Sequence, residues 1–213
     1  MIRITAMSGS GISEEEVAEA VKMLDAGLNG FHIRKPRISR KEMKEYLLLY
    51  PEAYRNRLVL HSFHDLAHRL KLGGIHISRS HRKRNRMYRI RLRLKRLMNS
   101  GLIVTRSFHT LTGVAEDRRR YSYAFLSPVF DSASKGTLGS GYSERALLMT
   151  LKQARCPIYA MGGVNPENLT RAASLGFTGA MLAGVLWRSD RRPHEVYEAA
   201  KEIAEGISPA RPI

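Results

Sequence analysis

Strand-like and helix-like segments alternate about eight times along this sequence. The strand-like segments are short and apolar, and the segments between them carry apolar residues at helical spacing. Alternation of this kind indicates a parallel sheet whose strands are joined by helices. The strand-like segments lie at 2–5, 30–34, 57–61, 74–78, 102–108, 123–127, 157–161 and 177–183.

Eight strand–helix units in 213 residues have the size of a compact barrel. We therefore predict an α/β protein with one domain, residues 1–213, folded as a single (β/α)8 TIM barrel. An open, doubly wound sheet is the alternative. Such a sheet usually has a glycine-rich turn after its first strand, and MSGSG at residues 7–11 matches that pattern only weakly.

Three helix starts carry capping signals. Ser13 and Ser39 each precede a glutamate by three residues, which is the spacing of a capping box. Asn165 is a suitable N-cap, and Pro166 after it suits the first helical position. These signals predict helices that begin just after Ser13, Ser39 and Asn165.

The chain is strongly basic, with 36 Lys and Arg residues against 19 Asp and Glu and a formal net charge of +17. No Asp or Glu occurs between Asp65 and Glu116, and the basic block, residues 79–98, lies inside that gap. We interpret the basic block as a solvated helix face, with a surface for nucleic acid or another anion as the alternative. Its single aromatic residue, Tyr88, gives little support for base stacking, so nucleic acid is not an expected partner.

Cys156 is the single cysteine, which excludes an internal disulfide and a cysteine metal cluster. The first residues contain no apolar core long enough for a signal peptide, and no stretch approaches the roughly 18 apolar residues that a membrane span needs. These features predict a cytoplasmic protein that does not bind membranes.

The carboxyl ends of the predicted strands gather cations, hydroxyls, imidazoles and glycines. In this barrel class the active site is built at those ends. The collection predicts an anion site and, within that class, a phosphate site. Its candidate residues are His32, Arg34, Lys35, His61, Ser107, His109, Ser132, Ser134, Lys135, Gly162, Gly163 and Gly184.

Gly162 and Gly163 are the strongest element of this predicted site. Without a Cβ they let a ligand approach the backbone, and the N–H groups of the following helix would point at it. Gly184, after the last strand, would complete a phosphate cradle, since barrels of this kind often bind phosphate after strands seven and eight. The alternative is that Gly162 and Gly163 only form a tight turn.

Two further side chains are candidates for chemistry. Lys135 lies in a Ser- and Gly-rich stretch that is typical of a lid carrying a cation, although an ordinary solvated lysine is the alternative. His109 is the candidate for proton transfer, because an imidazole titrates near neutral pH, although a structural role is the alternative. His61, His64 and His68 have spacings that mimic a metal site, but spacing alone is insufficient and no metal ligands are expected.

Five stretches together resemble the thiamine phosphate synthase family, which also contains the thiazole tautomerases. They are FHIRKP, GGIHIS, SFHT, YAFLSPVFDSASK and YAMGGVNPENL, in family order over most of the chain. The resemblance implies a TIM barrel that joins hydroxymethylpyrimidine diphosphate to thiazole phosphate with release of pyrophosphate. It also implies that these two phosphorylated compounds are the partners, and it leaves a homodimer open.

The resemblance implies roles for individual residues. Arg34 and Lys35 would hold pyrophosphate with help from Lys135. Ser132 and Ser134 match the hydroxyl pair before that lysine. Gly162 and Gly163 match the cradle for the thiazole phosphate.

The chain departs from the family pattern where magnesium is held. The family has Arg, any residue, Lys, whereas Lys35 follows Arg34 directly. His61 and Ser62 stand where an Asn–Asp pair is expected, and His81 lies near the place of a further Asp. Because magnesium prefers oxygen ligands, we expect at most a weak dependence on Mg2+ and no organic cofactor.

Two other functions remain open from sequence. A tautomerase acting on carboxythiazole phosphate needs neither diphosphate nor metal, and His109 would move its proton. A degenerate barrel would instead bind RNA or another anionic partner through residues 79–98. The synthase is preferred because Ser132, Ser134 and Lys135 belong to the synthase-like loop.

Overall fold

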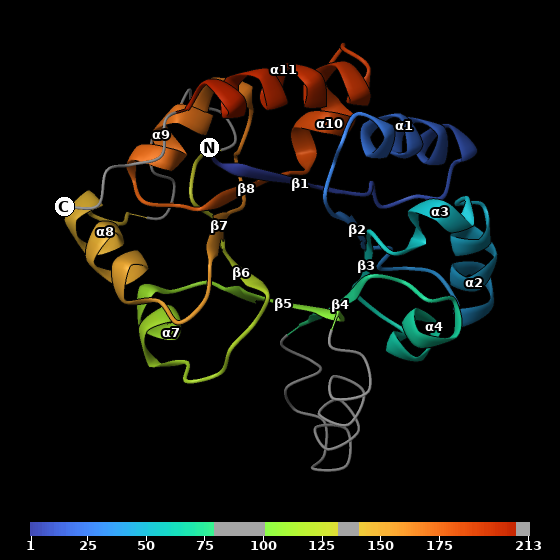
Figure 1. The fold of residues 1–213 in the computed structure, drawn as a ribbon, viewed down its shortest axis with the longest axis horizontal. Coiled ribbons are helices and arrows are strands. Elements are labelled where there is room, and N and C mark those ends of the chain that lie inside the picture. Colours follow the sequence, from blue (N-terminus) through green and yellow to red (C-terminus); the bar gives the residue numbers. More distant parts are fainter. Residues whose placement is uncertain (79–100, 132–140, 208–213) are drawn as a thin grey trace.

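The computed structural model describes residues 1–78, 101–131 and 141–207, and the basic block lies outside them. Eight parallel strands pair in chain order and close into a barrel (Figure 1). The strands are β1 Arg3–Met7, β2 Phe31–Ile33, β3 Leu58–Leu60, β4 Gly74–Ile77, β5 Ile103–Phe108, β6 Tyr123–Leu126, β7 Ile158–Ala160 and β8 Gly179–Leu182. The pairing of β1 with β8, from Arg3 opposite Gly179 to Ala6 opposite Leu182, excludes the open sheet and confirms the predicted barrel.

Helices surround the barrel on its outside (Figure 1). They are α1 Glu14–Asp25, α2 Arg40–Leu48, α3 Glu52–Arg55, α4 His64–Arg69, α7 Leu111–Glu116, α8 Glu144–Gln153, the 3-10 turn η1 Pro166–Asn168, α9 Leu169–Ser174, α10 Gly184–Arg188 and α11 Pro193–Gly206. Within the described residues, none of these helices is long and apolar enough to cross a membrane.

The helices α1 and α2 both begin just after the predicted serine, but only α2 has the complete capping box. At α2 the capping box is complete, because Ser39 accepts from the Glu42 backbone N–H at 3.2 Å and Glu42 accepts from the Ser39 backbone N–H at 2.7 Å. At α1 only half of it forms. Ser13 accepts from the Glu16 backbone N–H, but the Glu16 carboxylate accepts from the Gly9 backbone N–H at 2.6 Å instead. The Glu16 carboxylate therefore makes a tertiary contact instead of completing the capping box of α1.

Strands β1, β6, β7 and β8 each contribute residues to two apolar clusters. On β6, Ala124 and Leu126 join the large cluster between sheet and helices, whereas Tyr123 and Phe125 join a small cluster inside the barrel. The inner cluster consists of Met7, Tyr123, Phe125, Tyr159 and Met181. Phe125 has no exposed surface, so its burial contributes about 1.5–3 kcal/mol to folding. The barrel interior is thus filled with side chains and is not a pore.

Candidate active site

The loops that follow β7 and β8 enclose a cavity of about 380 Å3 at the carboxyl ends of these strands. Its lining consists of Gly162, Gly163, Val164, Asn165, Met181, Ala183, Gly184, Val185, Arg188 and Ser189. The structure therefore brings together the three glycines that sequence placed in one cradle. Arg188 adds a cation that sequence analysis missed, although its position four residues after Gly184 puts it on the same face of a helix.

Gly162 and Gly163 are also required by the fold itself. Their φ angles are +88° and +67°, a region that favours glycine. A Cβ on Gly163 would lie 2.3 Å from the Phe130 carbonyl oxygen, so the two backbones touch there. Gly162 and Gly163 therefore form a tight turn and also line the cavity. Gly184 is different, because a Cβ there would meet nothing within 4 Å.

Residues with unpaired backbone donors line this cavity, but they are not at the start of the helix after β7, as was expected. Asn165 accepts from the Asn168 backbone N–H at 3.1 Å, and Pro166 has no N–H to offer, so the chain caps this helix start itself. In the part of the chain that the structure describes, the backbone N–H groups of Gly163 and Gly184 have no hydrogen-bond partner. Gly163 lies in the loop after β7, and Gly184 is the first residue of α10, so the donors do not come from the helix that follows β7.

A second cavity, of about 460 Å3, lies at the opposite end of the barrel. It is lined by residues at the starts of β1, β7 and β8, among them Arg3, Pro157 and Thr178. Barrels of this class build their active sites at the carboxyl ends of the strands. We therefore assign the site to the smaller, glycine-lined cavity.

His109 lies exposed just past β5, at the same end of the barrel. Its Nδ1 is 2.8 Å from the Ser127 carbonyl oxygen, which can only accept, so Nδ1 carries a proton. In the neutral ring, the lone pair is then on Nε2. Tyr142 donates to the His109 carbonyl oxygen at 2.9 Å and holds the backbone. The arrangement leaves Nε2 as the atom that can accept a proton.

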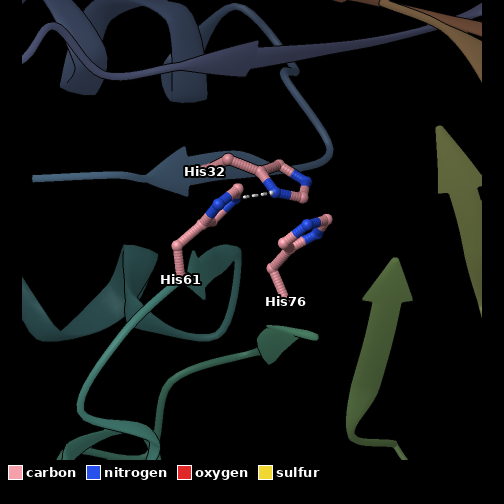
Figure 2. Close-up of side chains that lie close together, drawn as sticks. All are labelled: His32, His61 and His76. Atoms are coloured by element: carbon pink, nitrogen blue, oxygen red, sulfur yellow. Dashed lines mark hydrogen bonds between the residues drawn. The ribbon is translucent and has the colours of Figure 1, made fainter. Parts of the chain in front are cut away.

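Three histidines from neighbouring strands meet at this end of the barrel (Figure 2). His32 lies on β2, His61 directly follows β3, and His76 lies on β4. His32 Nδ1 is 2.9 Å from His61 Nε2, and the rings of His61 and His76 stack with centroids 4.1 Å apart. His32 and His61, both predicted to bind substrate, are thus in mutual contact.

Hydroxyl groups surround the other ring atoms of this cluster. His32 Nε2 lies 2.8 Å from the Tyr123 hydroxyl, and His76 Nδ1 lies 2.9 Å from the Thr105 hydroxyl. Ser107, a predicted substrate-binding residue, lies 3.2 Å from His76 Nε2 through its hydroxyl. Ser107 therefore orients a neighbouring histidine in this structure.

Burial favours the neutral form of His32 and His61. The pKa of His32 lies well below its ordinary value, first because the ring is buried and then because of the neighbouring His76. Burial also holds the pKa of His61 well below its ordinary value, and His76 and His32 lower it further. Neutral rings keep nitrogen lone pairs, which the cluster would lose if it were protonated.

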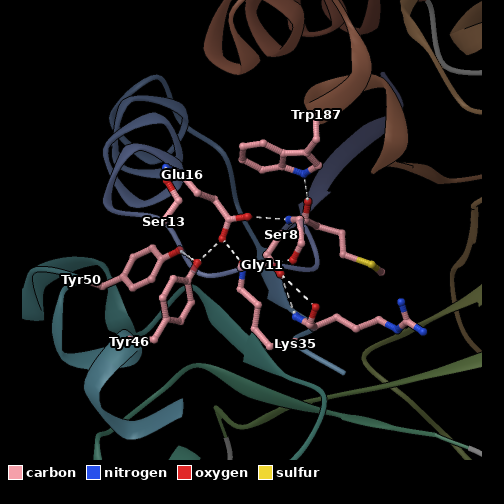
Figure 3. Close-up of polar contacts among 11 residues, drawn as sticks. Ser8, Gly11, Ser13, Glu16, Lys35, Tyr46, Tyr50 and Trp187 are labelled. Atoms are coloured by element: carbon pink, nitrogen blue, oxygen red, sulfur yellow. Dashed lines mark hydrogen bonds and ion pairs between the residues drawn. The ribbon is translucent and has the colours of Figure 1, made fainter. Parts of the chain in front are cut away.

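Arg34 and Lys35 lie in different surroundings, although the family resemblance implied that both hold pyrophosphate. Arg34 is exposed past the end of β2, and its backbone N–H donates to the Ser8 hydroxyl at 2.9 Å. Lys35 is buried, and its ammonium donates to the Glu16 carboxylate at 2.5 Å and to the carbonyl oxygens of Gly9 and Gly11 (Figure 3). The structure thus places Lys35 in an internal ion pair, with all three donors used.

The partners of Lys35 form one buried polar network beside α1. The Tyr46 hydroxyl also donates to Glu16 and lies 2.8 Å from the Tyr50 hydroxyl (Figure 3). The Lys35 ammonium lies 4.7 Å from the centroid of the Tyr46 ring, a cation–π contact. This network ties the end of β2 to α1 and α2. Of the two cations that follow the buried strand β2, Arg34 is exposed and Lys35 is structural.

The remaining predicted residues, Ser132, Ser134 and Lys135, lie outside the described residues. Their roles stay predictions.

The sequence model of a family described as thiamine monophosphate synthase matches residues 4–185. The chain belongs to the thiamine monophosphate synthase family. This confirms the resemblance that the five sequence stretches indicated.

Two thiamine-phosphate synthases match most of this chain at low sequence identity. The thiamine-phosphate synthase of Chlorobium phaeobacteroides is 21% identical over 204 residues, which cover 92% of this chain and 95% of the relative. The thiamine-phosphate synthase of Limosilactobacillus fermentum is 24% identical over 199 residues, covering 90% and 88%. The crystal structure of a thiamine phosphate pyrophosphorylase from Bacteroides thetaiotaomicron superposes with a TM-score of 0.76 at 24% identity, over 96% of this chain and 98% of that one. This likeness supports the barrel fold.

A magnesium site of the thiamine monophosphate synthase type does not fit the described residues. His61 and Ser62 stand where the resemblance implied oxygen ligands, and His61 contacts two other imidazoles. The nearby Asp65 is exposed and accepts from the Arg40 guanidinium, so its charge is already paired. Imidazole nitrogens in place of carboxylates disfavour magnesium.

Proposed function

We propose that this chain is a thiamine-phosphate synthase that joins hydroxymethylpyrimidine diphosphate to thiazole phosphate and releases pyrophosphate. The observation that carries the proposal is the glycine-lined cavity after β7 and β8, in a chain that the family model matches over residues 4–185. The thiazole phosphate would occupy this cavity. The backbone N–H groups of Gly163 and Gly184 would donate to it, and Arg188 would supply a positive charge.

The reaction breaks the bond between the pyrimidine methylene carbon and the diphosphate oxygen. The electron pair leaves with pyrophosphate, and the same carbon then bonds to the thiazole ring nitrogen. Because negative charge develops on the leaving group, the protein must mainly stabilise an anion. Arg34 suits this role, since it is exposed past the end of β2. Lys135 is proposed to assist, with Ser132 and Ser134 as hydrogen-bond donors.

The experiment is to incubate the full chain with both substrates and to quantify products by mass spectrometry and phosphate analysis. Thiamine phosphate and pyrophosphate should appear in equal amounts, and omission of thiazole phosphate should abolish the thiamine phosphate. A folded chain that forms neither product with both substrates present would contradict the proposal.

A thiazole tautomerase is the second candidate, and the geometry of His109 favours it. Its Nδ1–H is held by the Ser127 carbonyl, which leaves Nε2 for proton transfer. The test is exchange of the ring proton of carboxythiazole phosphate in deuterated water, for the wild type and for His109→Gln. Exchange that depends on His109, without coupling of the two synthase substrates, would favour the tautomerase. Coupling that survives in His109→Gln would favour the synthase.

A further inference from the structure

The three-histidine cluster is not explained by the proposed function. One nitrogen from each of His32, His61 and His76 lies within 4.8 Å of one from each of the others. The three side chains come from neighbouring strands (Figure 2), and His61 follows the carboxyl end of β3, at the end of the barrel that holds the candidate active site. Buried histidines more often satisfy each other through hydrogen bonds, so the cluster must be tested against that simpler role.

We propose that His32, His61 and His76 bind a zinc-type divalent transition metal ion. Imidazole nitrogens suit zinc, and three histidines with one open position form a known type of zinc centre. The proposal does not rest on thiamine phosphate synthesis by this chain. It replaces the magnesium site, which the described residues do not fit.

The spacing of the ring nitrogens fits such an ion. Zinc–nitrogen bonds of about 2.0–2.1 Å in a tetrahedron separate ligand nitrogens by roughly 3.3 Å. The His32 Nδ1 to His61 Nε2 distance is 2.9 Å, and the whole set lies within 4.8 Å. The rings of His61 and His76 are stacked, with only 13° between their planes, so one of them must rotate before both direct a lone pair at the same ion. The metal then takes the place of the proton shared by His32 and His61.

Hydroxyl partners hold the rings in orientations that suit a metal. With Nδ1 of His32 as ligand, its Nε2–H donates to the Tyr123 hydroxyl at 2.8 Å. Both nitrogens of His76 face hydroxyls, those of Thr105 and Ser107. One nitrogen can donate its N–H to its hydroxyl, and the other can coordinate the ion once its own hydroxyl contact is released. Such outer contacts fix ring orientation in metal sites and strengthen binding.

The charge around the cluster favours a site that also accepts an anion. Three neutral imidazoles leave the two positive charges of zinc uncompensated, and the fourth coordination position stays open for water or an anion oxygen. His61 is partly exposed, whereas His32 is fully buried, so access is from the His61 side.

The test uses the full chain, stripped with a chelator and dialysed, and titrated with Zn2+ by calorimetry and with Co2+ by visible absorption. We expect one ion per chain and the d–d bands of four-coordinate cobalt bound by nitrogen. His61→Gln and His76→Gln should each lower zinc affinity more than about 100-fold, beyond the 10–100-fold cost of losing an outer contact. Tyr123→Phe should lower it by roughly 10-fold.

The matched control is His68→Gln, because His68 is exposed on α4 and lies outside the cluster. It should bind zinc as the wild type does. A wild-type chain that takes up no ion would overturn the proposal whatever the variants do, and would leave the histidines as a hydrogen-bonded network. An equal loss of affinity in His68→Gln and His61→Gln would also overturn it. No thiamine precursor is present, so the result is independent of the proposed function.

Discussion

Nδ1 of His32 lies 2.9 Å from Nε2 of His61, and the two residues come from adjacent strands of the barrel. Their rings form one side of the barrel interior, while Tyr123, Phe125 and Tyr159 form the other. The interior is therefore polar toward β2–β4 and aromatic toward β6 and β7. The histidines do not line the glycine-lined cavity, so the two features are separate at this end of the barrel.

Lys35 should act on stability more than on substrate binding. Replacing it with Met leaves the buried Glu16 carboxylate without its cation, which should lower the free energy of unfolding by about 3–5 kcal/mol. Chemical denaturation of wild type, Lys35→Met and Lys41→Met measures this. Lys41 is the control, because its contact with Glu45 is at 4.0 Å and largely exposed, and its loss should cost about 0–1 kcal/mol. If Lys35→Met is as stable as the wild type but has a raised KM for the diphosphate, Lys35 binds substrate and the structural role is wrong.

Glu19 should make stability fall in acid. Burial acts to raise its pKa, but hydrogen bonds from Lys22 and His194 outweigh burial and lower the pKa to about 2. Because the folded pKa lies below the unfolded value of 4.5, the contribution is fully present above pH 4.5 and is lost as the pH falls towards 2. Urea unfolding of wild type and Glu19→Gln should differ by on the order of 2 kcal/mol at pH 7 and converge near pH 2.

The control for Glu19 is Glu198→Gln, an exposed change on the same helix as His194. It should stay within about 0.5 kcal/mol of wild type at every pH. A constant difference between wild type and Glu19→Gln down to pH 2 would show that the Glu19–His194 contact does not link α1 to α11 through charge.

Magnesium should affect coupling only weakly. The described residues offer imidazoles where oxygen ligands were implied, and the diphosphate itself can carry a metal ion. Coupling rates across a magnesium titration, at constant zinc, should rise shallowly without a tight saturable phase. Tight saturation would mean that Asp65, Asp131 or other carboxylates rebuild a magnesium site.

Much of the fold was predictable because apolar segments of strand length recur at regular spacing. The short helices α7 and α10 were missed, since six and five residues are too few to show a helical period. The sequence pattern of Ser13 and Glu16 predicted a full capping box, but a buried partner, Lys35, competes for the glutamate. Local signals cannot show such a tertiary preference.

The candidate site was predictable in part. The glycines were found because a cavity near a backbone requires residues without a Cβ. The cluster of His32, His61 and His76 was missed, because its members are distant in sequence and meet only once the barrel closes. Reading which strand residues point inward could have found it. Arg188 was missed because the helix that carries it was not predicted.

Binding of thiazole phosphate is the measurement that tests the central claim most directly. The cavity should bind the phosphorylated thiazole and not the free thiazole alcohol. Gly184→Leu should lower the affinity about 10-fold or more, about 1.4 kcal/mol, because Gly184 lines the cavity proposed for the phosphate and a Cβ there meets no atom within 4 Å. Gly206→Leu, an equally open position at the end of α11, should bind as the wild type does. Equal affinity for phosphate and alcohol, or an unchanged affinity in Gly184→Leu, would contradict the account.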